Sequence, residues 1–142
     1  MSGALLGTLR AIVFVAITLP LMPLQMLFLI AWPNMARCFP HFYHRFVRKL
    51  LGITLNINGA LPNGGQCLIV SNHVSWIDIV VLSAVAPLSF VAKREVATWP
   101  FFGWLAKLQR TVFVDRERRH STKHSRNELE TRLELGDRIV LF

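Results

Sequence analysis

The chain has 142 residues, a length typical of one domain with a single hydrophobic core. Hydrophobic residues make up 53% of it and the mean hydropathy is +0.43, which argues against an ordinary soluble domain and for a membrane-contacting segment. The formal net charge is +8, yet residues 1–36 carry a single charged side chain, Arg10. A basic surface over a whole domain is typical of nucleic-acid binding. An uncharged end before a basic body favours an anionic membrane surface instead, so we expect no nucleic-acid partner.

Residues 11–33 are an apolar stretch without charge. As a helix this stretch is roughly 34 Å long, enough to cross a bilayer. Pro20 and Pro23 interrupt it, and proline inside a helix kinks or breaks it. Three structures therefore stay open: a kinked spanning helix, two short helices that enter one leaflet, and a hairpin buried in the core. A signal peptide is disfavoured because no small-residue cleavage site follows the stretch.

Residues 37–52 are predicted to form a basic amphipathic helix, because Phe42, Phe46 and Leu50 share one helical face. Three basic side chains lie off that face: Arg45, Arg48 and Lys49. We expect this helix to lie at a membrane surface, the alternative being a solvated helix packed on the domain core. If the preceding stretch spans the membrane, the excess of positive charge after it places the rest of the chain in the cytoplasm.

From residue 52 onward, predicted strands and helices alternate. The expected strands are 53–57, 67–71, 88–92, 111–114 and 138–142, and the expected helices are 77–86, 95–108 and 121–135. This order predicts an α/β fold with a largely parallel central sheet flanked by helices. We therefore divide the chain into a hydrophobic membrane segment (1–36), a basic interfacial helix (37–51) and an α/β domain (52–142). The spacing of Cys38 and Cys67 favours free thiols, although a disulfide stays open.

Polar side chains closely follow three of the predicted strands. They are His73, Lys93, Asp115 and Arg116. Ligands of open parallel sheets bind beyond the carboxyl ends of the strands, so we expect these side chains to meet at one edge. Among them, Arg116 is the best candidate for gripping a phosphate, because arginine presents a planar fork of donors next to the strand end.

His73 and Asp78 are five residues apart, a spacing that separates two side chains within one helix. They can pair only if the chain turns at His73 and a helix starts near Ser75. The carboxylate would then fix the imidazole tautomer and leave the other ring nitrogen to act as a general base. The alternative from spacing alone is an N-capped helix beside an incidental histidine.

Four short motifs occur in series: NHVSWID (72–78), AKRE (92–95), PFFG (100–103) and FVDR (113–116). Together they resemble the HxxxxD block and the second conserved stretch of the glycerolipid acyltransferases, the family that contains 1-acylglycerol-3-phosphate acyltransferase. The resemblance runs from about residue 50 to the end and favours the catalytic reading of the histidine. It implies transfer of a fatty acyl group from acyl-CoA or acyl carrier protein to a lysophospholipid hydroxyl at a membrane, with no metal or bound cofactor. In a bacterial cell the expected location is the inner membrane, with the catalytic domain on the cytoplasmic face.

The same resemblance implies roles for individual residues. His73 is the general base and Asp78 orients and charges it. Arg116 matches the family's phosphate-binding arginine and Lys93 assists it, while Asn72 and Ser75 shape the turn beside the substrate. The expected acceptor is 1-acyl-sn-glycerol-3-phosphate, which would give phosphatidic acid. The alternatives are a lyso-ornithine lipid acceptor and a non-catalytic membrane-binding module; oligomeric state and acyl length stay open.

The sequence departs from the family pattern in two places. Family members often have glycine where this chain has Arg110. The third block, a Phe-Pro-Glu-Gly-Thr-like turn that helps to bind acceptor phosphate, would begin at Phe142, where the sequence ends. We therefore expect a truncated chain with an unfinished sheet edge and little acyltransferase activity of its own.

Overall fold

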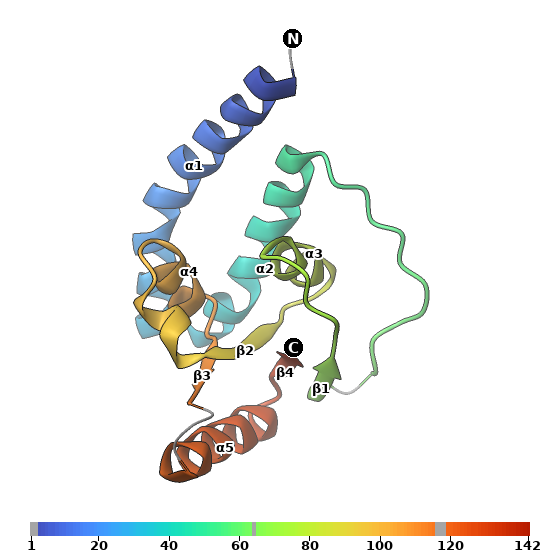
Figure 1. The fold of residues 1–142 in the computed structure, drawn as a ribbon. Coiled ribbons are helices and arrows are strands. Elements are labelled where there is room, and N and C mark those ends of the chain that lie inside the picture. Colours follow the sequence, from blue (N-terminus) through green and yellow to red (C-terminus); the bar gives the residue numbers. More distant parts are fainter. Residues whose placement is uncertain (1–2, 64, 116–118) are drawn as a thin grey trace.

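The computed structural model describes residues 3–63, 65–115 and 119–142, with only the backbone for 119–124 (Figure 1). The helices are α1 (Gly3–Ala31), α2 (Pro33–Leu51), α3 (Ile77–Val85), α4 (Phe102–Leu108) and α5 (Arg119–Glu134), with one 3₁₀ helix, η1 (Arg94–Thr98). The strands are β1 (Cys67–Val70), β2 (Ser89–Lys93), β3 (Val112–Val114) and β4 (Arg138–Leu141). The predicted alternation of strands and helices after residue 52 is thus confirmed in outline.

Within the described residues, the four strands form one sheet in the order β1-β4-β2-β3. Every pairing is parallel, and β4 lies centrally between β1 and β2. Central strands of a covered parallel sheet need apolar side chains on both faces, and Ile139 and Val140 of β4 are fully buried. The predicted α/β fold with a parallel sheet flanked by helices is confirmed.

Two predicted elements are wrong. Residues 53–57 form no strand: although side-chain exposure alternates over 53–56, the segment pairs with no described strand and belongs to the long connection from α2 to β1 (Figure 1). The helix predicted over 95–108 is split into η1 and α4, because Pro100 interrupts it and Phe101 takes a positive φ of 61°. Gly103 lets α4 pack onto η1, since a Cβ there would lie 2.6 Å from the carbonyl oxygen of Ala97.

The apolar N-terminal stretch is one continuous helix, so it is neither broken at its prolines nor buried as a core hairpin. Pro20 and Pro23 both lie on the exposed side of α1. By length and composition α1 could cross a membrane, and only 11% of its most apolar window is buried. Its large exposed side chains are Leu5, Leu6, Leu9, Ile12, Val15, Leu19, Leu24, Met26, Leu27 and Ile30.

Helix α2 runs back antiparallel to α1 (Figure 1). Gln25 Nε2 donates to the Ala36 carbonyl at 3.0 Å, and Arg10 Nη1 donates to the Leu51 carbonyl at 3.1 Å. One face of α2 is buried in the domain at Ala36, Pro40 and Val47. The predicted apolar face points elsewhere, since Phe42 is 61% exposed and Phe46 43% exposed. Helix α2 therefore packs on the domain and also offers an aromatic and basic outer face; that this face lies at a membrane surface stays a prediction.

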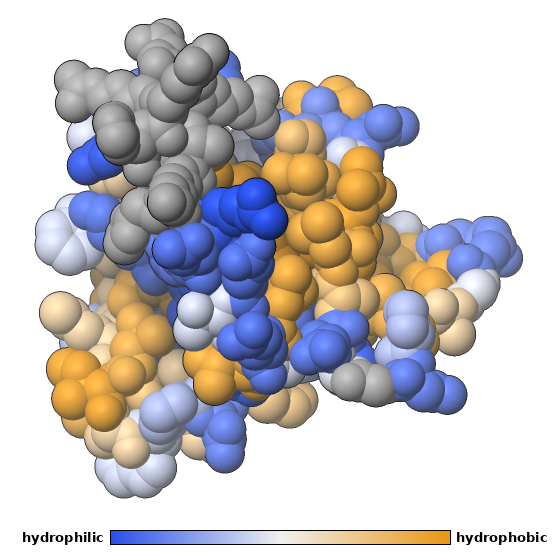
Figure 2. Space-filling model, turned by 90° about the horizontal axis from the view of Figure 1, so that it is seen from below, coloured by the Kyte–Doolittle hydropathy of each residue, from blue (hydrophilic) through white to orange (hydrophobic). Residues whose placement is uncertain are grey.

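Hydrophobic and hydrophilic side chains share the surface of the molecule. Figure 2 shows broad apolar areas next to strongly hydrophilic ones on the face seen from below. A monomeric soluble domain rarely exposes apolar patches larger than a few hundred Å². This surface fits the membrane contact expected from the composition.

Candidate active site

The chain turns sharply between β1 and α3, and this turn brings His73 to Asp78. The Nδ1 of His73 lies 3.1 Å from Oδ2 of Asp78, which occupies the first turn of α3. The same carboxylate oxygen accepts the backbone N–H groups of Val74 at 2.7 Å and Ser75 at 2.9 Å. The pairing therefore forms through the turn that the spacing required.

Asp78 is held in its ionised form. The backbone N–H of Ser75, then that of Val74, and after them the neighbouring His73, lower the pKa of the Asp78 carboxyl below its ordinary value. An ionised carboxylate can only accept hydrogen bonds, so Nδ1 of His73 must be the donor. The lone pair of the neutral ring then lies on Nε2, the nitrogen that a general base uses.

An aromatic stack supports the histidine from the end of the sheet. The ring of Phe142 lies 4.2 Å from that of His73, nearly parallel, and stacks in turn on Phe90 of β2. The His73 side chain is 43% exposed, so the ring is positioned without being closed off from substrate. Sequence reasoning missed Phe142 as a site residue; its position directly after β4, next to the carboxyl end of β1, was the available signal.

A large apolar cleft opens beside His73. Its volume is about 650 Å³, within the range of ligand sites in proteins. It is bounded by α1, α2, α3, β2, η1 and α4, and it extends from His73 and Lys93 at one edge of the sheet to Gln25 and Gln109 near the other. His73 thus lies at one end of a long apolar space.

His44 lines the same cleft but is kept neutral. Its Nδ1 donates to the carbonyl of Pro40 at 2.8 Å. Burial lowers the pKa of His44 to about 4; the hydrogen bond to Pro40 opposes the shift and the nearby His41 adds to it. His44 therefore contributes a neutral polar edge to the cleft wall.

The other predicted site residues are placed unequally. Lys93 is exposed at the end of β2 and lines the cleft together with His73. Ser75 shapes the turn, since its Oγ accepts the N–H of Ile77 at 3.2 Å, and Asn72 is exposed before the histidine. Arg116 lies outside the described residues. Among residues 3–63, 65–115 and 119–142, no group of three His, Cys, Asp or Glu side chains could hold a metal ion.

The structure combines a parallel α/β sheet with a His–Asp pair beside an apolar cleft. Acyl transfer to a lipid needs these two features, a base and a space for an apolar chain. The family profile described as Acyltransferase matches residues 52–142, and the chain belongs to this acyltransferase family. No solved structure matches it.

The chain is similar to curated relatives of two kinds. It is 49% identical to a lyso-ornithine lipid O-acyltransferase of Brucella abortus and 43% identical to one of Rhizobium meliloti; these alignments cover 97% and 94% of this chain and 53% and 46% of the relatives. A 1-acyl-sn-glycerol-3-phosphate acyltransferase of Neisseria gonorrhoeae is 38% identical over 57% of this chain and 31% of that protein. The chain spans about half the length of the first two relatives.

Proposed function

We propose that this chain carries the catalytic base of an enzyme that transfers a fatty acyl group to the free hydroxyl of a membrane lysolipid. The observation that carries the proposal is the His73–Asp78 pair, with its tautomer fixed, at the mouth of a 650 Å³ apolar cleft. Membership of the acyltransferase family supports it. The donor is acyl-CoA or acyl carrier protein, and the reaction needs no metal or bound cofactor.

In the proposed reaction, Nε2 of His73 takes the proton of the acceptor hydroxyl while the hydroxyl oxygen attacks the thioester carbonyl carbon. Asp78 stabilises the imidazolium that forms, because it is ionised and bonded to Nδ1–H. When the carbon–sulfur bond breaks, the imidazolium returns the proton to the departing thiolate. The products are the acyl ester and the free thiol, and the base is regenerated. Lys93 and Arg116 are proposed to bind the polar headgroup, with Asn72 and Ser75 beside it.

For the acceptor, we put a lyso-ornithine lipid first. The chain is 49% and 43% identical over almost its whole length to two relatives named for that acceptor. The relative named for 1-acyl-sn-glycerol-3-phosphate aligns over little more than half of the chain. The phosphate acceptor remains the second candidate, supported by that relative and by the arginine at position 116.

We further propose that α1 lies in one leaflet of the bacterial inner membrane, with the domain on its cytoplasmic face. Contacts run along most of α1: Arg10 and Thr18 bond to Leu51 and Tyr43 of α2, and Gln25 Nε2 donates to the Leu108 carbonyl of α4 at 2.9 Å. A helix attached to the domain along this length could cross the bilayer only by drawing the domain into it. Its exposed apolar side remains available to lipid.

The location of the N-terminus tests this placement. In a chain whose cysteines are replaced by serine, Gly3→Cys should resist a membrane-impermeant thiol reagent added outside intact spheroplasts and react after lysis. Labelling in intact spheroplasts would show instead that α1 spans the membrane.

The catalytic proposal is tested with a full-length protein that contains this chain. Radiolabelled acyl-CoA and acyl carrier protein are offered with a panel of lysolipids that includes both candidate acceptors. We expect labelled product with a lyso-ornithine lipid and loss of that product in His73→Ala. Vesicle binding without product from any lysolipid would favour a non-catalytic membrane-binding module. That the 142 residues alone turn over little remains a prediction, checked with the purified chain in the same assay.

A further inference from the structure

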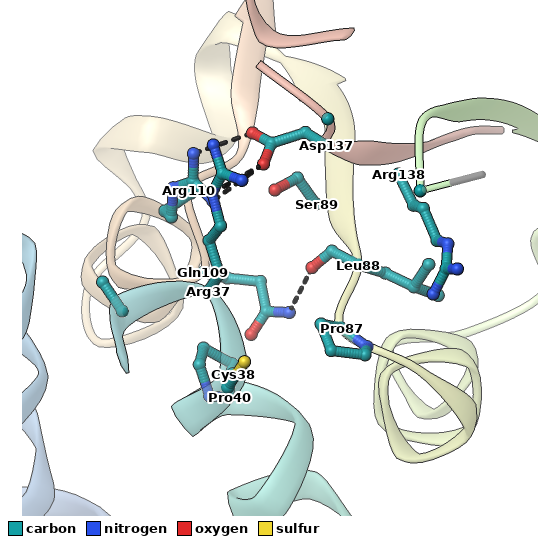
Figure 3. A pocket seen from close by; sticks show the side chains of 13 residues that line it. Arg37, Cys38, Pro40, Pro87, Leu88, Ser89, Gln109, Arg110, Asp137 and Arg138 are labelled. Carbon is teal, nitrogen blue, oxygen red and sulfur yellow. Dashed lines mark hydrogen bonds and ion pairs between the residues drawn. The ribbon is translucent and has the colours of Figure 1, made fainter. Parts of the chain in front are cut away.

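A second pocket lies at the opposite edge of the sheet from His73, where the strands begin. Figure 3 shows the side chains that line it. Its volume is about 210 Å³, and it is lined where the strands begin, by residues just before or at the start of β1, β2 and β4, and by the first turns of α2. The strands between the two edges have three to five residues each, so the edges lie roughly 10–17 Å apart. The pocket therefore lies away from His73, although it adjoins the far end of the apolar cleft, since Pro40 and Gln109 line both. Its proposed function does not depend on the catalytic proposal.

Arginines from three separate elements converge beside this pocket on one carboxylate. Asp137, whose side chain is 4% exposed, accepts Nη1 and Nη2 of Arg110 at 3.2 and 2.7 Å. Arg132 Nε lies 3.0 Å from Oδ2 of the same carboxylate, and Arg37 Nε lies 3.2 Å from Oδ1. The α1–α2 hairpin, the turn before β3 and helix α5 thus all meet at Asp137.

The positive charge here exceeds the negative charge that faces it. Arg138 also lines the pocket, across from Arg37 and Arg110 in Figure 3, and its buried Nε has no hydrogen-bond partner among the described residues. A buried donor without a partner costs free energy unless a ligand or water satisfies it. Besides Asp137, Glu128 lies 3.9 Å from Arg132, so among the described side chains two carboxylates face four arginines.

The backbone at Arg110 gives an independent reason to assign a role to this cluster. Helix α4 ends in a Schellman motif: the N–H groups of Arg110 and Thr111 donate to the carbonyls of Lys107 and Ala106. The left-handed position of that motif usually holds glycine, as it does after α2 at Gly52 and after α5 at Gly136. After α4 it holds Arg110 at φ 62°.

A side chain at such a position costs about 1 kcal/mol or more relative to glycine. Arg110 is further disfavoured as a cation, because burial lowers its pKa and the positive charges of Arg132 and Arg37 oppose the rise that Asp137 produces. The cluster therefore holds a partly buried arginine at a position that suits glycine, among arginines that repel it.

We propose that this pocket binds a phosphate group, either inorganic phosphate or the phosphate monoester headgroup of an anionic lipid. Arginine forks match the oxygens of phosphate, and Arg138 and Arg37 lie on opposite sides of a space large enough for one such group. The pocket lies beside the α1–α2 corner, where Trp32 is 54% exposed and Met35 is 49% exposed. A lipid surface that receives these side chains would bring phosphate headgroups to the pocket.

The test measures phosphate binding by the purified full chain in detergent, from the shift in its unfolding midpoint at constant ionic strength. We expect Arg138→Gln to need about tenfold more inorganic phosphate for the same shift, because a charge-assisted hydrogen bond is lost. Arg138 makes no hydrogen bond to Asp137, so the variant should unfold normally without phosphate. Arg110→Gly is the second variant, because glycine suits the left-handed backbone at position 110.

The matched control is Arg126→Gln, which removes the same charge from a side chain that is 76% exposed on α5. Equal phosphate response in both glutamine variants, or no response of the wild type to phosphate or vesicles, would overturn the proposal. Binding to lipid vesicles distinguishes the two sources of the phosphate group. Preference for phosphatidic acid over phosphatidylglycerol that depends on Arg138 identifies a lipid headgroup, and phosphate binding without that preference identifies free phosphate.

Discussion

The sheet has a carboxyl edge, where its parallel strands end near His73, and an amino edge, where they begin near Asp137. These two edges are built in opposite ways. At the carboxyl edge, His73 and Asp78 lie five residues apart and pair through one turn, and both side chains are partly exposed. At the amino edge, Asp137 is buried and holds arginines up to 100 residues away in sequence. The first arrangement can change without disturbing the fold, whereas the second ties the fold together. Mutations at the two edges should therefore separate chemistry from stability.

The largest expected effect is on turnover at the carboxyl edge. His73→Ala in the full-length protein should lower the rate by about 10²–10⁴-fold, the usual contribution of a general base. Its unfolding midpoint should stay near that of the wild type, because the side chain is 43% exposed and makes one hydrogen bond. Single-turnover acyl transfer and thermal unfolding measure the two quantities on the same sample.

His41→Ala is the control for loss of a histidine. The Nδ1 of His41 lies 2.7 Å from the carbonyl of Ser83, and His41 does not line the cleft, so turnover should survive. If His73→Ala keeps wild-type turnover, the base has been misassigned. If it lowers turnover and the unfolding midpoint together, the two edges are not separable in the way proposed.

The opposite pattern is expected for Asp137→Ala. Removing the carboxylate leaves three arginine side chains partly buried without their shared partner, and loss of one member of a buried ion pair costs about 3–5 kcal/mol. We expect the lower end, about 3 kcal/mol, because Arg37 is 30% exposed and water can reach it. Urea unfolding of the purified chain measures the change in free energy of unfolding.

Glu130→Ala is the matched control, since Glu130 is 55% exposed and pairs with Arg126 on the surface of α5. Such exposed pairs contribute about 0–1 kcal/mol. A similar small loss for Asp137→Ala and Glu130→Ala would mean that the arginine cluster does not hold the α1–α2 hairpin on the sheet.

The same difference explains what could be predicted from sequence. Local patterns and motif spacing determine the order of strands and helices, the turn at His73 and its pairing with Asp78. These features could therefore be predicted from the sequence. The convergence on Asp137 depends on the depth at which α2 and α5 pack, which no local pattern encodes. The strand predicted at 53–57 failed for a related reason, because alternation describes one strand but not the partner it needs. Phe142 was interpreted only as the residue at which the third block would begin, although its ring stacks on His73.

Lowering the pH should reduce the stability of the protein through His44, which lines the apolar cleft between the two edges. The folded pKa of His44 is about 4 and its ordinary value is 6.5, so between these pH values the unfolded chain binds more protons. Stability from this group is therefore complete above pH 6.5 and is lost as the pH falls toward 4. We expect a loss of about 2 kcal/mol, which is less than the full shift implies because the ring is partly exposed to the cleft.

Urea unfolding of the wild type and His44→Gln across pH 4–7 isolates this contribution, since glutamine does not titrate and the carboxylates are common to both. The difference in free energy of unfolding should change with pH over that window. Parallel pH dependence of the two proteins would show that His44 is not held neutral in the folded chain.

The smallest expected effect concerns the backbone that presents Arg110. Arg110→Gly and Arg110→Ala both remove the two hydrogen bonds to Asp137, which keeps Arg37 and Arg132 as partners. They differ in the left-handed conformation at φ 62°, which glycine adopts without strain and alanine does not. Arg110→Gly should therefore be more stable than Arg110→Ala by about 1 kcal/mol in urea unfolding. Equal stability would mean that the turn after α4 adapts to its side chain; the strain assigned to Arg110 would then vanish, and the argument for a ligand at the amino edge would rest on charge alone.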